Sequence, residues 1–446
     1  MSDIAQLKAF AQAAIDRRRD WIVSVAKTVA SNPELGFREV ATASLVSDKL
    51  AELGIAHEKG IALTGLKGYL DGGSKGPTVG IIGEMDSLRV PGHPDADPDS
   101  GAAHACGHHC QLGMLLGVAT ALSQPEVLGA LSGRIALMGL PAEEFTDVEY
   151  RWRLHQEGRL GLMGGKQEFI RLGTFDDVDM AMMVHTAASP FKTKFTAGGS
   201  SNGHLVKHVT FLGKAAHAGG SPHRGINALQ AALIALNALN AQRETFRDWD
   251  TIRLHGIITE GGDAANATPA QVRYEGRVRG ASLAAIDDAN RKMDRSLRAG
   301  ALALGAKVEI VTIPGYLPVL NDAGLLGVFR QNAEALVGRD AFKVHPEERV
   351  KGGSTDMGDL SQIMPAIHPY TGGASGMGHG VDYTIVDYEQ AIIRPAKAMA
   401  MAVIDLLADG AAQGREVIAK SNPPMTKDQY LSLQNSRLTE ESYVGE

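Results

Sequence analysis

The first part of the chain shows a helical pattern of apolar residues. Between residues 4 and 32 the apolar side chains recur near helical spacing, as on one face of an amphipathic helix. They are Ile4, Leu7, Phe10, Ala14, Trp21, Ile22 and Val25. The segment 32–36 (Asn-Pro-Glu-Leu-Gly) ends this helix, and a second helix is predicted over 40–53, closed by Gly54.

Further along, apolar strands alternate with helices, and polar residues follow the strands. The predicted elements are a strand pair over 66–70 and 78–83 joined by a glycine-rich turn, a helix over 108–123, and strands over 134–140 and 180–184. The strand over 134–140 leads into Pro141-Ala142-Glu143-Glu144, and the last strand ends in His185. Functional groups collect at the C-terminal ends of strands in an open α/β sheet. The pattern therefore predicts an α/β domain with a site at these strand ends.

The pattern changes at about residue 200. The segment 205–313 reads as strand, helix, two strands, helix and strand, which is the order of a ferredoxin-like sandwich. Because α/β material resumes afterwards, we interpret this unit as an insertion. The expected domains are 1–199 (catalytic, first part), 200–313 (inserted) and 314–446 (catalytic, second part), with an extended arm from residue 412 onward.

Composition limits the class of protein. The 446 residues are too many for one ordinary core, 21% of them are charged, and the net charge is −7. This balance gives no reason to expect binding to nucleic acid or to a membrane. Two cysteines are too few for a disulfide framework. With no visible secretory signal and no apolar run of about 18 residues, we expect a cytoplasmic protein.

A dense group of metal-binding residue types stands at the start of the helix over 108–123. The run 104–109 reads His-Ala-Cys-Gly-His-His. A lone cysteine or histidine is usually a core residue, but several within six positions favour a site for a transition metal. We predict Cys106 and His108 as ligands, with the helix N-terminus favouring the thiolate.

The two glutamates after the strand over 134–140 suit two different roles. Just past a strand end, one side chain can face a metal and the other the substrate. We interpret Glu144 as a ligand and Glu143 as the general base that takes a proton from water. The alternative is that both glutamates are simply exposed to solvent. His185 is equally compatible with a core histidine. Asp86 is interpreted as a carboxylate that orients a ligating histidine, and the role of Glu84 stays open.

Other candidate residues lie later in the chain. His379 is flanked by glycines, which let the backbone approach a bound group. In the inserted unit, His217 follows a strand, Asn266 lies in a Gly/Ala-rich loop, and Arg279 lies on a strand face with Arg277. A histidine and an arginine suit polarisation of a carbonyl and capture of a carboxylate, although solvated surface residues remain an alternative.

Taken together, these motifs resemble the aminoacylase/carboxypeptidase family of metallohydrolases. The likeness is to the branch that has a cysteine ligand and hydrolyses N-acyl amino acids, indole-acetyl amino acids and aminobenzoyl-glutamate. It rests on Glu84-Met85-Asp86, the 104–109 run, 141–144, His185, 213–219, Pro222, 225–228, Asn266, Arg279, 353–356 and His379. The resemblance implies a zinc-peptidase-like α/β/α catalytic domain with a mixed sheet, and an inserted lid domain that also mediates dimerisation.

The resemblance also implies roles for single residues. Glu143 would be the general base, and His217 would reach the partner subunit's active site to stabilise the oxyanion. Asn266 and Arg279 would hold the substrate, with Arg279 on its carboxylate. The metal ligands would be Cys106, His108, Glu144, His185 and His379. They would bind one or two divalent ions per subunit, manganese or zinc, with cobalt or nickel as further candidates.

Two departures from the family pattern bear on the substrate. The chain has His109 where the branch usually has aspartate, and it carries an insertion over 147–161 that includes Tyr150, Trp152 and Arg153. We expect the insertion to line or cover the substrate pocket. The favoured function is hydrolysis of an amide C–N bond outside peptide chains, in a small substrate that carries a carboxylate. The alternatives are hydrolytic deamination of an electron-poor aryl amine such as a nitro-substituted aminobenzoate, and a metal-stabilised binding protein without catalysis.

Overall fold

The computed structural model describes residues 3–188 and 192–445, and it begins with three helices rather than the two predicted. The first predicted helix is divided at Arg18, whose φ of −106° and ψ of 13° interrupt the helical backbone. The resulting helices are α1 (Ile4–Arg17) and α2 (Arg19–Ala30), and α3 (Val40–Glu52) follows. No helix of the described residues is long and apolar enough to cross a membrane.

A six-stranded mixed sheet forms the centre of the catalytic domain. Its order is β1 (His57–Ile61), β2 (Gly65–Asp71), β6 (Ser132–Leu140), β3 (Ser74–Glu84), β7 (Met180–Met182) and β15 (Ala366–Ile367). The prediction that β2 pairs with β3 is wrong. β6 lies between them, antiparallel to β2 and parallel to β3. Because eight of its nine residues are buried, β6 belongs in the middle of a sheet.

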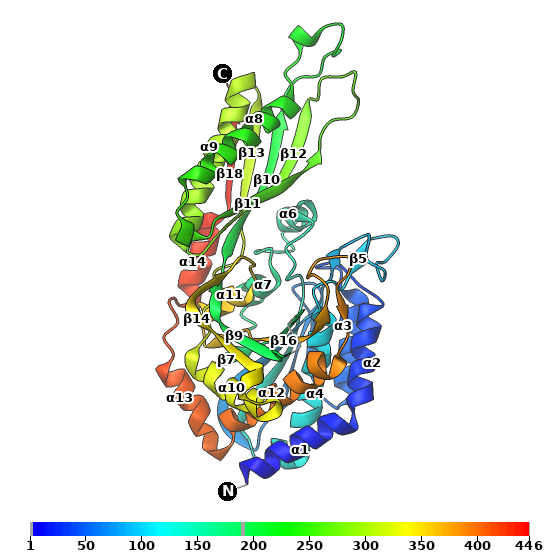
Figure 1. The fold of residues 1–446 in the computed structure, drawn as a ribbon, viewed down its shortest axis with the longest axis vertical. Coiled ribbons are helices and arrows are strands. Elements are labelled where there is room, and N and C mark those ends of the chain that lie inside the picture. The colour runs from blue at the N-terminus through cyan, green and yellow to red at the C-terminus, as the bar shows by residue number, and fades with distance from the viewer. Residues whose placement is uncertain (1–2, 189–191, 446) are drawn as a thin grey trace.

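Helices cover both faces of this sheet, which confirms the predicted α/β class (Figure 1). One face packs against α1, α4 (His108–Leu122), α10 (Ala323–Val337) and α12 (Arg394–Leu407). Every residue of α4 is buried. The other face packs against α7 (Gly165–Arg171), α11 (Met357–Ser361) and α14 (Lys427–Arg437). Short elements complete this domain: β4 (Leu88–Arg89), β5 (Ala102–Ala103), α5 (Pro125–Leu128) and α6 (Val148–Gln156).

A second sheet continues from the first and forms one wall of the cavity that is described below. It contains β8 (His185–Ala188), β9 (Phe195–Ser201), β14 (Phe342–Lys351), β16 (Tyr370–Ser375) and β17 (Thr384–Ile385). His185 therefore begins β8 instead of ending the strand before it, which corrects the predicted boundary. In the parallel pair of β8 with β16, His185 lies opposite Tyr370.

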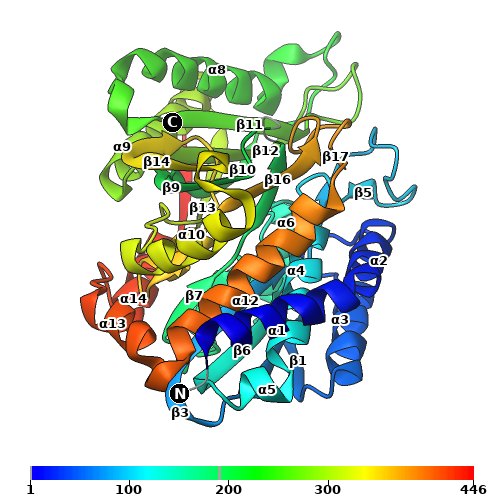
Figure 2. The same cartoon turned by 60° about the horizontal axis from the view of Figure 1, so that its bottom comes forward.

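The inserted unit forms a separate lid domain above the catalytic domain (Figures 1 and 2). Its antiparallel sheet has the order β11 (Arg253–Glu260), β12 (Gln271–Gly280), β10 (Gly203–Leu212), β13 (Lys307–Pro314) and β18 (Thr439–Val444). Two helices, α8 (Ala228–Ala241) and α9 (Leu283–Leu304), cover one face around a core of their own. The order of the first four strands matches the ferredoxin-like sandwich that the sequence predicts.

The end of the chain differs from the predicted extended arm. It forms α13 (Ala412–Lys420), α14 and β18, and β18 pairs antiparallel with β13 as the fifth strand of the lid sheet. This strand covers an edge of β13 that would otherwise present unpaired backbone groups. The polar composition of the segment therefore reflects an exposed edge strand and surface helices.

Candidate metal centre and active site

The turn before α4 positions Cys106 and His108 on either side of a glycine. Gly107 has a φ of +93°, and a Cβ atom there would lie 2.5 Å from the hydroxyl oxygen of Tyr383. Both facts require glycine. The Sγ atom of Cys106 lies 3.3 Å from Nε2 of His185, so β8 and the start of α4 meet at this point.

Asp86 fixes the orientation of His108. The buried ring donates from Nδ1 to the carbonyl oxygen of Asp86 at 2.9 Å, with the Asp86 carboxylate 3.1 Å away. Because Nδ1 carries the proton, Nε2 is the nitrogen left for a ligand. The other carboxylate oxygen of Asp86 accepts a hydrogen bond from the backbone N–H of Glu144 at 2.8 Å. One side chain thus aligns two of the predicted ligands.

The turn that carries Glu143 and Glu144 is held in a rare backbone conformation. Ala142 has a φ of +57°, an arrangement that costs about 1–3 kcal/mol and persists only where the surroundings enforce it. Its N–H donates to the buried Glu39 carboxylate at 2.8 Å. Its carbonyl accepts from Arg151, which also donates to the carbonyl of Glu144. These contacts hold the two glutamates just beyond the C-terminal end of β6.

The insertion supplies Arg151, and none of its residues 147–161 lines the main cavity, so the expectation that it lines the pocket is wrong. Helix α6 of the insertion lies behind the glutamate turn, and its Trp152 is buried against Phe145 and Tyr316. The aromatic residues of this insertion suggested contact with a ligand. They instead form a small core that supports the wall of the site.

The predicted ligands converge from distant parts of the chain. Three groups of potential donor atoms have all their members within 4.8 Å of one another, and these are Cys106–His108–His185, Cys106–Glu144–His379 and Glu84–His108–Glu143. The ring of His379 reaches Glu144 at 3.1 Å from a loop whose backbone is anchored on the carbonyl of Ala105. Cys106 is shared by two groups.

The donor atoms fit a divalent transition metal. Among the described residues, Nε2 of His108 and Oε1 of Glu144 are buried and make no hydrogen bond, although charged atoms lie 3.1 Å from each. Buried polar atoms normally have partners, so these two are available to a cation. A set of thiolate, imidazole and carboxylate donors suits zinc, manganese, cobalt or nickel.

A buried lysine, missed in the sequence, bridges two carboxyl groups beside this cluster. Lys166 on α7 lies 2.5 Å from Glu84 and 2.5 Å from Asp356, and all three side chains are buried. Burial opposes the charge of Glu84, but Lys166 and then His108 outweigh it and hold its pKa below the usual range. Nothing around a single lysine in the sequence indicates this long-range pairing.

The two adjacent glutamates have opposite electrostatic environments. Burial, followed by the charges of Glu84, Glu144 and Asp356, raises the pKa of Glu143 well above its ordinary value. For Glu144, burial is outweighed by His379, and its pKa falls to about 2. Carboxyl groups whose pKa values are pushed apart in this way suit a proton-transferring group next to a permanently charged one.

The surroundings of Cys106 favour its thiolate over its thiol. Burial and the charge of Glu144 oppose its thiolate, but the rings of His185 and His108 outweigh them and lower its pKa to about 6. The thiolate is the form that binds metals. Cys110, one turn later, has its pKa raised to about 12, first by burial. The two cysteines therefore differ in character although the sequence places them four residues apart.

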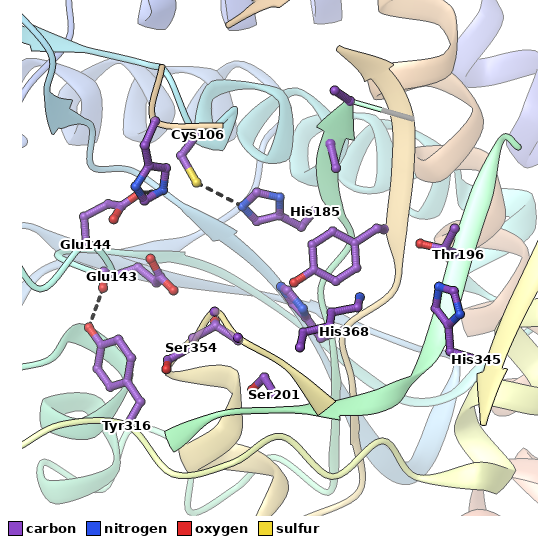
Figure 3. A pocket seen from close by; sticks show the side chains of 18 of the residues that line it. Cys106, Glu143, Glu144, His185, Thr196, Ser201, Tyr316, His345, Ser354 and His368 are labelled. Carbon is purple, nitrogen blue, oxygen red and sulfur yellow. Dashed lines mark hydrogen bonds and ion pairs between the residues drawn. The ribbon is translucent and has the colours of Figure 1, made fainter. Parts of the chain in front are cut away.

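A cavity of about 1070 Å³ connects this cluster to the lid domain. Cys106, Glu143 and Glu144 lie on one side of it, and His345 and Thr196 lie on the other, with His185 and His368 between them (Figure 3). The lid contributes Arg279, which donates to the hydroxyl of Ser354 at 2.8 Å, and Arg277, which donates to the carbonyl of Phe145. The cavity also contains His204, Tyr316 and His368, which sequence patterns do not predict because isolated aromatic residues give no local signal.

His217 and Asn266 do not line this cavity in their own subunit. Both are exposed, and they are neighbours, since the N–H of Ala218 donates to the carbonyl of Asn266 at 2.9 Å. His217 also forms an isolated antiparallel bridge with Ala267. The fold therefore brings these two predicted residues together on the lid surface, away from Cys106 and Glu143.

Comparisons with known proteins agree with this geometry. A Xaa-Arg dipeptidase from Mus musculus is 31% identical over 327 residues, which are 70% of this chain and 68% of the relative. Among solved structures, an aminobenzoyl-glutamate utilization protein from Klebsiella pneumoniae aligns with a TM-score of 0.67 and 20% identity over 88% of this chain and 97% of that one.

A dinuclear metal-binding peptidase from Bacillus subtilis aligns with a TM-score of 0.62 and 21% identity, over 89% of this chain and 99% of that one. These two structures support the fold. The family model described as peptidase family M20/M25/M40 matches residues 80–405, a span that contains the cysteine–histidine turn, the glutamate pair, the lid and the His379 loop. The chain therefore belongs to the peptidase family M20/M25/M40.

Proposed function

We propose that this protein is a metal-dependent hydrolase of an amide C–N bond outside peptide chains, in a small substrate that carries a carboxylate. N-acyl amino acids and aminobenzoyl conjugates are the compounds that fit this description. One observation carries the proposal: the buried Glu143 lies beside the cluster of metal donors, and the same cavity contains Arg279. A proton acceptor and a carboxylate-binding cation therefore face one space.

Cys106, His108, Glu144, His185 and His379 would hold the metal. The two donor groups that share Cys106 support room for two ions, and manganese or zinc is the first choice. When bound, the metal supplies Lewis-acid activation of water and of the substrate carbonyl. His379 and Glu144 attract each other, which raises the pKa of His379 to about 11. Metal binding must therefore release this proton.

The side chains supply the remaining chemistry. Glu143 takes a proton from water, and the water oxygen forms a bond with the carbonyl carbon. The C–N bond then breaks as Glu143 returns the proton to the leaving nitrogen. The raised pKa of Glu143 suits it to hold this proton between the two steps. Arg279 would orient the substrate through its carboxylate.

Replacing Cys106 with alanine is expected to remove metal from the protein. The loss should exceed the roughly 10- to 100-fold drop in affinity that follows removal of an outer partner of a ligand. Elemental analysis of the purified variant measures this. Cys110→Ala is the matched control because Cys110 is a buried cysteine four residues away, on α4, and belongs to none of the donor groups. Full metal occupancy in Cys106→Ala would make Cys106 a packing residue.

The reaction itself is tested by offering the metal-loaded protein several substrate classes. These are N-acyl amino acids, aminobenzoyl-glutamate, dipeptides and nitro-substituted aminobenzoates. Release of free amino acid from the first two supports the proposal. Release of ammonia from the nitro compounds alone would replace it with aryl-amine deamination, and cleavage of dipeptides alone would replace it with a peptidase activity.

A further inference from the structure

The cavity is far more basic than the proposed reaction needs. Its acidic lining consists of Glu143 and Glu144, both in the metal cluster. Seven lysine and arginine side chains also line it. Besides Lys194 there are six, and none of the six forms a salt bridge with another described residue: Arg253, Arg277, Arg279, Lys343, Arg349 and Lys351. One arginine would be enough for one carboxylate. The other five of these six side chains form no salt bridge in the described part of the chain.

Lys351 is the most informative member of this set. It is the last residue of β14 and only partly exposed, and its Nζ atom lies 3.7 Å from the centre of the Tyr370 ring. Burial, and next the charge of Arg349, lowers the pKa of Lys351 to about 8. A partly buried ammonium without a carboxylate partner is unfavourable unless a ligand compensates it.

The ring of Tyr370 contacts both Lys351 and His185. The centre of the Tyr370 ring lies 5.5 Å from that of His185, so one aromatic ring separates the ammonium from a predicted metal ligand. Arg349 lies next to this position and is fixed by a 2.8 Å hydrogen bond to Nδ1 of His345. Figure 3 shows His345 across the cavity from the two glutamates.

Lys351 and Arg279 have different partners in the cavity. Arg279 donates to the hydroxyl of Ser354 at 2.8 Å, whereas Lys351 lies against the ring of Tyr370 beside Arg349. The two cations are therefore held by different side chains. With a volume of about 1070 Å³, the cavity is at the upper end of the range for small-molecule sites, so it has room for a substrate that reaches both.

We propose that Lys351, Arg349 and His345 form an anion subsite, and that the substrate carries a second anionic group in addition to the carboxylate bound by Arg279. This inference rests on the proposed amide hydrolysis and specifies its substrate class. The substrate is an amide that carries two anionic groups. Amides with a cationic group at the Lys351 end are poor substrates because the subsite repels them.

A set of matched amides tests the subsite in the metal-loaded enzyme. The set is N-benzoylglycine and its 4-carboxy, 4-sulfo and 4-trimethylammonio derivatives on the benzoyl ring. The wild type is expected to prefer the carboxy or sulfo compound to the neutral one by roughly 10- to 100-fold in kcat/KM, the range of a charge-assisted contact. The better of the two anions shows whether the subsite is built for carboxylate or for a tetrahedral oxyanion.

Variants of Lys351 assign the preference to this side chain. In Lys351→Met the ratio of anionic to neutral kcat/KM should fall towards one, and Lys351→Arg should keep it. Lys59→Met, an exposed lysine on β1 outside the cavity, is the control and should keep the wild-type ratio. An unchanged ratio in Lys351→Met, or no preference in the wild type, would overturn the subsite.

A binding measurement separates this inference from the proposed function. Terephthalate and benzoate are titrated by calorimetry into the metal-loaded Glu143→Gln protein, which needs no turnover. Tighter binding of terephthalate that disappears with Lys351→Met supports the subsite even if every amide resists hydrolysis, and in that case the proposed function alone fails. Equal binding of the two acids contradicts the subsite whatever the amides show.

Discussion

Glu143→Gln is expected to lower kcat by about a hundred- to ten-thousandfold, the usual contribution of a general acid–base group. Glutamine has nearly the same shape, but it cannot take a proton from water. Because Glu143 is not among our five proposed ligands, the metal content should stay that of the wild type. Initial rates on an N-acyl amino acid and elemental analysis of the same preparation measure the two quantities.

The glutamine variant needs a control on the same segment. Glu157 follows α6 with a side chain that is 48% exposed, so Glu157→Gln should have wild-type rates. A Glu143→Gln enzyme that keeps wild-type turnover would remove Glu143 as the general base. Loss of metal together with activity would instead make it a ligand, as its place beside Glu84 and His108 would permit.

Changing His217 to alanine is expected to reduce kcat by about a hundred- to a thousandfold, as loss of an oxyanion-stabilising donor does. His217 and Asn266 lie together on the lid but not in the cavity of their own subunit. We therefore propose that the chain forms a homodimer in which His217 acts in the partner's active site. A symmetric dimer makes such an exchange reciprocal.

Mixing two inactive variants tests this exchange. A His217→Ala subunit keeps its own Glu143, and a Glu143→Gln subunit keeps its own His217, so a mixed dimer has one complete site. Random mixing should restore about a quarter of the wild-type activity, because about half of the dimers are mixed and each has one working site of two. No recovery, with mixed dimers demonstrated by two affinity tags, would place His217 in its own subunit's site or outside catalysis.

Local patterns in the sequence predicted much of the fold and of the candidate site. Alternation and helical spacing located β6, α4, α9 and the lid strands. The cluster at the start of α4 pointed to Cys106 and His108, and the strand end after β6 pointed to the glutamate pair. Such patterns depend on neighbours in the chain, so they are visible before folding. The same reasoning failed where pairing is non-local. It paired β2 with β3 and missed β18 as an edge strand of the lid.

The missed parts of the site share one physical cause. Lys166 and Asp356 act through a contact between segments far apart in the sequence. A lysine buried between two carboxylates is indistinguishable in sequence from an exposed lysine, which is the common case. Lys351 is a similar case. Its role depends on having no carboxylate beside it among the described residues, and the sequence alone does not show this.

The central claim is that the cysteine, histidine and glutamate side chains gathered around Cys106 bind divalent metal on which turnover depends. Removing metal with a strong chelator, followed by dialysis and stepwise return of manganese or zinc, tests it most directly. The account predicts that N-acyl amino acid hydrolysis disappears with the metal and returns in proportion to one or two ions bound per subunit. Unchanged hydrolysis by protein shown by elemental analysis to contain no metal would contradict it.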